Sequence, residues 1–342
     1  MLPASRSRVA AAFKELAHES VSGLPFLELL WSACTRDRPL GAAAEVLEAA
    51  SRAFDEAAPL GIVPLPLFDG RYPALLAATP DPPPVLWFSG HLDVLTRRTV
   101  AVVGSRAATP YALQVGTRLA GELAERGVIV VSGLARGVDS AAHRGCLDAG
   151  GATVAVQGCG LDRVYPPEHT DLASRIAKNG LLCSELAPGA APLPEYFPLR
   201  NRIISGISLA TVVVEASERS GSLITARCAL EQGRDVMAVP GSVLSGRNRG
   251  SHALLKDGAR VVETADDVLE GLGWAGMANP GDGANSLPED PLLAQMAVGE
   301  PYGLEELAAL AAAPGTELLP RLTELEIAGL IAVSSGRFVR LS

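Results

Sequence analysis

Hydrophobic residues in the central part of the chain form short unbroken runs, separated by segments in which apolar residues recur every three or four positions. Unbroken runs are typical of strands buried on both faces of a parallel sheet, and the longer spacing is typical of helices that cover one face. The predicted strands are Val100–Val103, Val128–Val131, Thr153–Val156, Leu181–Ser184, Ala210–Glu215, Asp235–Val239 and an edge strand at Ala259–Val262. The predicted helices are Tyr111–Arg126, Ser140–Ala149, Asp171–Asn179 and Ser222–Gln232. This alternation predicts an α/β fold with a doubly wound, mostly parallel sheet.

The segments on either side of this region have a different pattern. Residues 1–60 predict a small helical (SAM-like) domain with helices near 5–20, 25–34 and 42–57, and a proline-rich connector follows up to Pro84. Residues 273–295 are rich in Gly, Asn, Asp and Pro, which indicates a flexible linker. Two helices and a hairpin follow within residues 296–342, an order that suggests a winged helix. The sheet domain is therefore expected to span residues 61–272.

Composition limits where the protein is expected to be located and what it is expected to bind. No run of the 342 residues reaches the roughly 18–20 apolar residues that cross a bilayer, and the first twenty residues lack a signal-peptide core, so a cytoplasmic protein without membrane insertion is expected. The five cysteines form no Cys-x-x-Cys pair, which argues against a disulfide framework or a zinc site. A net charge of −9 argues mildly against nucleic acid, although 26 of the 29 basic residues are arginines and many of these lie beside glycines in predicted loops.

Polar loops follow several of the predicted strands. They are Gly104–Arg106, Ser132–Asp139, Gly158–Gly160 and Ser217–Ser222. Because ligands of open parallel sheets bind beyond the carboxyl ends of the strands, these loops are expected to share one edge. Ser220, Gly221, Ser222 and Thr225 begin a helix whose free N–H groups favour anions, and Arg200, Asn201 and Arg202 lie just upstream. The residues predict an anion or phosphate pocket; the alternative is ordinary capping of a buried α/β unit.

Familiar catalytic motifs are missing from these loops. The turn after the first strand has one glycine instead of Gly-x-Gly-x-x-Gly, and neither a P-loop nor a Gly-x-Ser-x-Gly elbow occurs. Ser132, Asp139 and His143 could be imagined as a hydrolytic triad, but nothing supplies an oxyanion site. We therefore expect no catalytic residue, no metal and no cofactor.

Several motifs together resemble one family, the DNA-processing proteins DprA/Smf, over residues 64–270. They are Val102–Arg106, Ser132–Asp139 with Ala142-His143, Tyr165-Pro166, Phe197-Pro198 with Arg200–Ile204, Ser220–Ala226 and Val239–Gly241. The resemblance implies an extended Rossmann-like fold that protects single-stranded DNA and loads RecA onto it in natural transformation or recombination. It also implies a homodimer through the end of the sheet domain, where Leu254 and Leu255 are the candidate interface residues.

The expected DNA-binding residues combine the resemblance with the anion-pocket argument. They are Gly104, Ser105, Arg106, Ser132, Gly133, Arg136, Gly137, Asp139, Arg200, Asn201, Arg202, Ser220, Gly221, Ser222 and Thr225. Few aromatic residues lie in these loops, so base stacking is expected to add little.

Two other functions remain open from the sequence. One is a Rossmann-like nucleotide hydrolase of the phosphoribohydrolase type, although the glutamate and glycines of that motif are missing around Ser220. The other is a winged-helix regulator with a ligand-sensing sheet. The predicted recognition helix at 317–328 carries three glutamates against a single arginine, so this module is not expected to be the main DNA reader.

Overall fold

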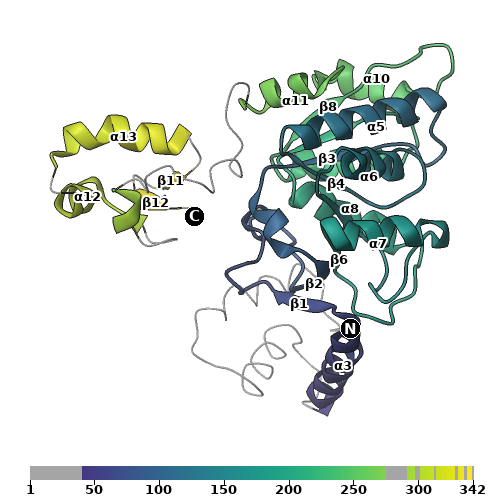
Figure 1. Cartoon of the computed structure of the whole chain (residues 1–342), viewed down its shortest axis with the longest axis horizontal. Coiled ribbons are helices and arrows are strands. Elements are labelled where there is room, and N and C mark those ends of the chain that lie inside the picture. Colours follow the sequence, from purple (N-terminus) through teal and green to yellow (C-terminus); the bar gives the residue numbers. More distant parts are fainter. Residues whose placement is uncertain are drawn as a thin grey trace. The chain divides into compact units, whose positions relative to one another are not determined.

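The computed structural model describes residues 41–274, 291–296, 301–311, 313–327, 330–334 and 337–340. The chain divides into two compact units, one up to Asn279 and one from Pro280 onward, which are described separately (Figure 1). The predicted helices near 5–20 and 25–34 lie outside the described residues, as does most of the predicted linker.

A nine-stranded sheet forms the centre of the first unit. In chain order its strands are β1 (Val63–Pro66), β2 (Val85–Gly90), β3 (Thr99–Val103), β4 (Ile129–Ser132), β5 (Thr153–Val156), β6 (Leu181–Ser184), β7 (Ala210–Val213), β8 (Asp235–Ala238) and β9 (Arg260–Val261). Their order across the sheet is β1-β2-β6-β5-β4-β3-β7-β8-β9; β2 pairs in the antiparallel sense with both β1 and β6, and the strands from β6 to β9 are parallel. The mostly parallel, Rossmann-like sheet predicted from the sequence is therefore confirmed.

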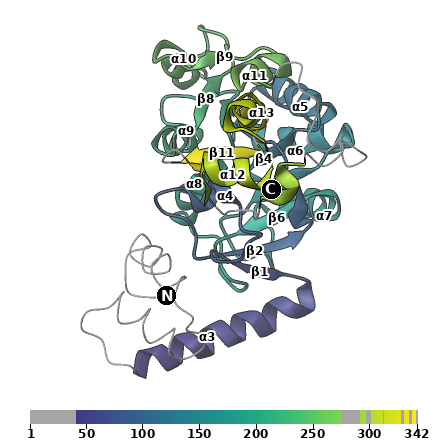
Figure 2. The same cartoon turned by 90° about the vertical axis from the view of Figure 1, so that its left-hand side faces the viewer.

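Helices cover both faces of this sheet (Figure 2). The helices of the first unit are α3 (Gly41–Ala57), α4 (Ala74–Ala77), α5 (Pro110–Glu125), α6 (Val138–Asp148), α7 (Thr170–Asn179), α8 (Tyr196–Gly206), α9 (Ser222–Glu231), α10 (Arg249–Lys256) and α11 (Ala265–Gly271), with short 3₁₀ turns η1 (Ala58–Leu60), η2 (Leu92–Thr96) and η3 (Pro167–His169).

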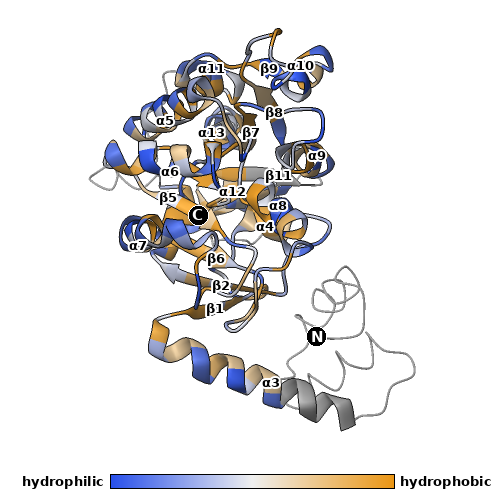
Figure 3. Ribbon diagram, turned by 90° about the vertical axis from the view of Figure 1, so that its right-hand side faces the viewer, coloured by the Kyte–Doolittle hydropathy of each residue, from blue (hydrophilic) through white to orange (hydrophobic). Residues whose placement is uncertain are grey.

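Alternation along β3 shows how the core is divided. Val100 and Val102 point into a cluster with α5, α6 and α11, whereas Ala101 and Val103 point into a cluster with α4, α8 and α9. All four side chains are buried, as the unbroken apolar run requires when both faces of a strand are covered. Figure 3 shows this arrangement as apolar strands enclosed by helices that carry hydrophilic residues.

The third predicted N-terminal helix is present as α3 and ends against the sheet. Ala57 is buried in a cluster with Trp87 and Ile62, and the rings of Phe54 and Trp87 lie 5.7 Å apart edge to face. The last turns of α3 thus pack on the same core as β2. A separate domain boundary at residue 60 stays a prediction.

The turn after β3 is fixed by contacts from distant residues. Thr109 caps α5, since its side chain accepts from the N–H of Ala112 at 3.2 Å, and Pro110 occupies the first helical position. Glu215, just after β7, accepts from the N–H of Thr109 at 3.2 Å and from its hydroxyl at 2.6 Å. These bonds hold the segment between Gly104 and Thr109 at the carboxyl end of β7.

The second unit contains a three-stranded antiparallel sheet in the order β10-β12-β11. Its elements are η4 (Leu293–Gln295), β10 (Pro301–Tyr302), α12 (Leu304–Leu310), α13 (Gly315–Ile327), β11 (Ile331–Ser334) and β12 (Arg337–Arg340). The predicted pair of helices and the hairpin are present in the expected order. The winged-helix assignment itself stays a prediction.

Two general features of the described residues bear on function. None of their helices is both long and apolar enough to cross a membrane. Among the same residues, no group of three or more His, Cys, Asp or Glu side chains is arranged to hold a metal ion.

Candidate nucleic-acid interface

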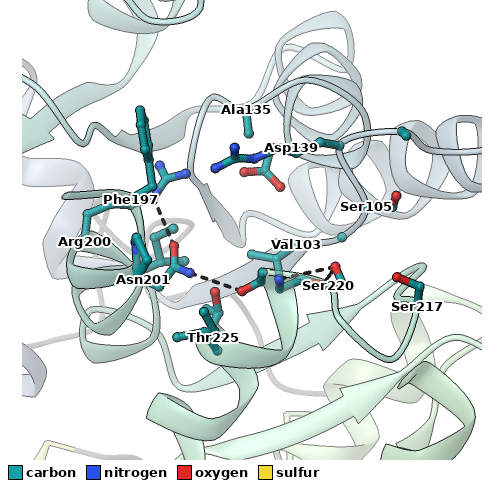
Figure 4. A pocket seen from close by; sticks show the side chains of 18 of the residues that line it. Val103, Ser105, Ala135, Asp139, Phe197, Arg200, Asn201, Ser217, Ser220 and Thr225 are labelled. Carbon is teal, nitrogen blue, oxygen red and sulfur yellow. Dashed lines mark hydrogen bonds between the residues drawn. The ribbon is translucent and has the colours of Figure 1, made fainter. Parts of the chain in front are cut away.

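A cavity of about 520 Å³ lies at the carboxyl edge of the sheet (Figure 4). It is bordered by the turn after β3, the loop between β4 and α6, helix α8, and the turn between β7 and α9. Three of the four polar loops expected at this edge therefore meet around one space. The fourth, Gly158–Gly160, is buried, and the Cα of Gly158 faces the ring of Phe197.

Arg106 is the exposed cation of this cavity. Its guanidinium carbon lies 5.2 Å from the centroid of the Phe197 ring, within the range of a cation–π contact. Among the described residues no hydrogen bond or ion pair joins its guanidinium to a carboxylate or a carbonyl, although its charge opposes the rise in the pKa of the buried Asp139. The side chain keeps its hydrogen-bond donors available to a ligand.

Arg200 has the opposite environment. It is buried, and one guanidinium nitrogen donates to the carbonyl oxygens of both Gly133 and Val156. Its Nε donates to Oδ1 of Asn201 at 3.1 Å, and Nδ2 of Asn201 donates to the carbonyl of Gly221 at 3.2 Å. Arg200 and Asn201 thus connect three of the cavity's borders, the β4–α6 loop, α8 and the turn before α9.

Asp139 completes the buried polar group beside Arg200. Its Oδ2 accepts from the N–H of Gly133 at 3.1 Å. Burial raises the pKa of Asp139, and the charge of Arg200 acts in the opposite direction. Burial likewise lowers the pKa of Arg200 to about 10. Arg200 is therefore held by contacts inside the protein before any ligand arrives.

The imagined triad is not formed. Ser132 is buried and its hydroxyl donates to the carbonyl of Val102 at 2.7 Å. Nδ1 of His143 lies 2.8 Å from the hydroxyl of Thr153, and burial lowers the pKa of His143 to about 3. Since Ser132, Asp139 and His143 each bond to a different group, no proton relay links them.

The turn before α9 supplies hydroxyls and backbone. The hydroxyls of Ser220 and Ser222 lie 2.7 Å apart, while Gly221 is exposed at the start of the helix. Thr225, one turn further, is buried at the floor of the cavity. Hydroxyls and N–H groups at a helix start suit an anionic oxygen, and the nearby guanidinium of Arg106 adds to this preference.

Comparison with known proteins agrees with this architecture. Residues 65–273 match the profile of the family described as DNA recombination-mediator protein A. The chain is 43% identical to Protein Smf of Escherichia coli, over 79% of this chain and 75% of that protein. It is 45% identical to DNA processing protein DprA of Streptococcus pneumoniae, over 59% of this chain and 72% of that protein.

The chain belongs to the DprA/Smf family.

Solved structures of DprA share the fold. The crystal structure of DprA from Streptococcus pneumoniae superposes with a TM-score of 0.69 at 36% identity, over 77% of this chain and 92% of that one. DNA processing protein A from Helicobacter pylori, whose structure describes a single-stranded DNA binding mode, superposes with a TM-score of 0.56 at 30% identity, over 62% of this chain and 95% of that one.

Most of the site residues expected from the DprA resemblance do border the cavity. Those that line it are Gly104, Ser105, Arg106, Asp139, Arg200, Asn201, Ser220, Gly221, Ser222 and Thr225. Gly133 and Arg136 line a small adjoining recess. Gly137 lines neither space, and it has to be glycine for the turn itself, because its φ of 78° favours glycine and a Cβ there would collide with the carbonyl oxygen of Ser105.

Two further expected residues lie outside the lining of the cavity and of the recess. Ser132 is enclosed beneath the sheet edge by its bond to Val102, as described above. Arg202 points away from the cavity's lining, where it pairs with Glu185 at 2.6 Å and donates to the carbonyl of Asp81 at 2.5 Å. The sequence could not separate Arg202 from Arg200, since their partners lie far away along the chain.

Two aromatic residues of the cavity were missed as site residues. Tyr165 and Phe197 both line it, with ring centroids 5.2 Å apart and planes tilted by 39°. They come from segments outside the four polar loops, so counting aromatics within the loops overlooked them. Their presence in the Tyr165-Pro166 and Phe197-Pro198 motifs was the available signal.

Proposed function

We propose that the cavity at the carboxyl edge of the sheet binds the backbone of single-stranded DNA, and that the protein acts on that strand in recombination without catalysing a reaction on it. The observation that carries the proposal is the combination of Arg106, a free guanidinium, with the Phe197 ring at the mouth of a cavity lined by Ser and Gly. Guanidinium forks and backbone N–H groups bind phosphate oxygens without reacting with them.

The aromatic rings favour a single strand over a duplex. A base can stack on Tyr165 or Phe197 only when it is not stacked between its neighbours in a helix. The protein would contact the phosphate backbone and the faces of the bases, which every nucleotide presents, so little sequence preference is expected. The single-stranded DNA binding described for the Helicobacter pylori relative supports the same assignment.

A nucleotide hydrolase is the less favoured function. The carboxylate that lines the cavity, Asp139, accepts a backbone hydrogen bond and faces Arg200 from a fully buried position. A general base would instead need access to a water or hydroxyl group. Incubation of the protein with nucleotides and nucleoside monophosphates is expected to yield no product.

Fluorescence anisotropy tests the binding proposal directly. A labelled thymine strand of about 20 nucleotides, longer than the roughly 4–16 nucleotides that a single-strand binding fold covers, is titrated with the full chain, with the matched duplex and a mononucleotide as competitors. We expect the strand to bind and the unlabelled strand to compete at much lower concentration than duplex or mononucleotide. Equal competition by duplex, or saturation by the mononucleotide, would contradict the proposal.

The family description, a recombination mediator, supports a role in recombination, and the resemblance to DprA/Smf implies a further step in which the bound strand is passed to the recombinase RecA. We propose that the protein is a homodimer during this step and loads RecA onto the strand. The test is RecA filament formation on a strand coated with single-strand-binding protein, followed by RecA ATPase activity. A faster onset with this protein supports loading, and an unchanged onset contradicts it.

A further inference from the structure

A second arginine at the cavity mouth is held by an internal carboxylate. Nε of Arg136, in the loop between β4 and α6, lies 2.5 Å from Oε1 of Glu168 in η3. Both side chains are about half exposed, at 57% and 49%. The pair is therefore at the surface, where solvent and a passing anion can reach both partners.

This ion pair lies next to the proposed strand-binding cavity. Arg136 lines a recess that shares Arg106, Tyr165 and Phe197 with the main cavity. A strand that leaves the main cavity beside Tyr165 and Arg106 meets the guanidinium of Arg136 next. At that point its phosphate encounters a cation that already has an anionic partner.

Carboxylate and phosphate compete for the same donors of a guanidinium. Each partner of the pair also stabilises the charged form of the other: the hydrogen bond to Glu168 raises the pKa of Arg136, and the bond from Arg136 lowers the pKa of Glu168. Both groups thus stay charged near neutral pH. An exchange of Glu168 for phosphate is a replacement of one anion by another and needs no proton.

We propose that Glu168 competes internally with DNA phosphate for Arg136 and thereby sets the affinity and salt dependence of single-strand binding. This inference rests on the proposed function. A phosphate that displaces Glu168 gains one guanidinium contact, but the freed carboxylate then needs its own counterion. The contact at Arg136 therefore adds little to the salt dependence as long as Glu168 is present.

Replacing Glu168 by Gln tests this competition. An exposed ion pair is worth so little that its removal is expected to tighten strand binding by about two- to fivefold at about 50 mM NaCl. Arg136 then takes its phosphate with full counterion release, which steepens the slope of log affinity against log salt by about 0.7. The advantage of Glu168→Gln over the original chain should thus shrink by roughly 2.6-fold between about 50 and 200 mM NaCl.

The chain offers a matched control. Asp148, the last residue of α6, forms a similar exposed pair with Arg175 at 2.6 Å, and neither residue lines the cavity or its recess. Asp148→Asn removes the same charge, and its affinity and slope are expected to match those of the original chain. Arg136→Ala and the Arg136→Ala/Glu168→Gln double variant complete a cycle, in which Glu168→Gln should have no effect once Arg136 is absent.

Two results would overturn the inference. One is an unchanged affinity and slope in Glu168→Gln; the other is an equal gain when Arg136 is absent, which would indicate a general effect of charge. Melting temperatures of all variants check that the fold is intact. The proposed function fails separately, if Arg106→Ala binds the strand as tightly as the original chain.

Discussion

Replacement of Arg106 by Ala is the most direct test of the strand-binding cavity. The side chain is exposed, lies 5.2 Å from the Phe197 ring, and within the described residues donates to no carboxylate or carbonyl. Truncation removes the contact with the Phe197 ring, worth roughly 0.5–1 kcal/mol at an exposed site, and is otherwise expected to leave the fold intact. Arg106→Lys keeps the charge but loses the planar fork and much of its contact with the ring.

The magnitude follows from the contacts that Arg106 can make. A charge-assisted hydrogen bond to phosphate contributes about 1.5–3 kcal/mol, which corresponds to a ten- to hundredfold loss of affinity at about 1.4 kcal/mol per factor of ten. Each neutralised phosphate on a single strand contributes about −0.7 to the slope of log affinity against log salt. Arg106→Ala should therefore make the slope shallower by about 0.7, and Arg106→Lys should restore part of the affinity.

Anisotropy titrations at several salt concentrations measure both quantities, and thermal melting of the same samples reports on the fold. Arg175→Ala is the matched control, since it removes an exposed arginine whose carboxylate partner lies at the far end of α6. If Arg106→Ala keeps its affinity and slope, the cavity does not bind the strand. A lowered melting temperature with unchanged binding would assign Arg106 to its own turn.

Four further predictions concern other parts of the molecule. Gly133→Ala places a methyl group against the buried guanidinium of Arg200, so we expect a loss of about 1–3 kcal/mol in the free energy of unfolding, measured by denaturant titration; an unchanged midpoint would contradict it. Folding lowers the pKa of His143 from 6.5 to about 3. Between these two pH values the imidazole binds a proton in the unfolded chain but not in the folded one, so the free energy of unfolding decreases as the pH falls. His143→Leu should flatten the dependence of the melting temperature on pH over this range. A chain that ends at Trp274, whose ring packs on the sheet unit, should keep most of its single-strand affinity, as measured by anisotropy, and loss of that affinity would identify the second unit as the reader. Leu255→Glu should give folded monomers in light scattering, and a persistent dimer would place the interface elsewhere.

The apolar residues at the expected dimer interface can be explained either by contact with a second chain or by packing within one chain. Leu254 and Leu255 are both half-buried in α10, and Leu254 packs against the core that lies beneath α8 and α9. Its apolar character is thus explained at least in part within one chain. Leu255 is therefore the better residue for testing the interface.

The second unit is consistent with the expectation that it is a poor reader of DNA. In the candidate recognition helix, α13, Arg321 forms an ion pair with Glu324 at 2.7 Å. The basic residue that could approach phosphate is thereby already matched by an acid on the same helix, and Glu317 adds negative charge near its start.

The sequence by itself determined the parallel strands, four of the helices that cover them and the edge at which the polar loops meet, but it did not predict α8, which carries Arg200 and Asn201. Unbroken apolar runs such as Val100–Val103 have few alternatives to a strand covered on both faces, and parallel strands bring their following loops to a common edge. These properties depend on residues close together along the chain and on the general geometry of parallel sheets. The order of the amino acids is therefore sufficient to predict them.

The tertiary structure alone decided which polar residues at that edge are free to bind. The sequence does not distinguish the four arginines of this edge from one another. In the structure Arg106 is open and Arg136 is paired with Glu168. Arg200 is buried against two carbonyls, and Arg202 is held by Glu185. The carbonyl of Gly133 lies 67 positions from Arg200, and Glu168 lies 32 positions from Arg136. The availability of a charge depends on partners that only folding brings within reach, and spacing along the chain does not encode them.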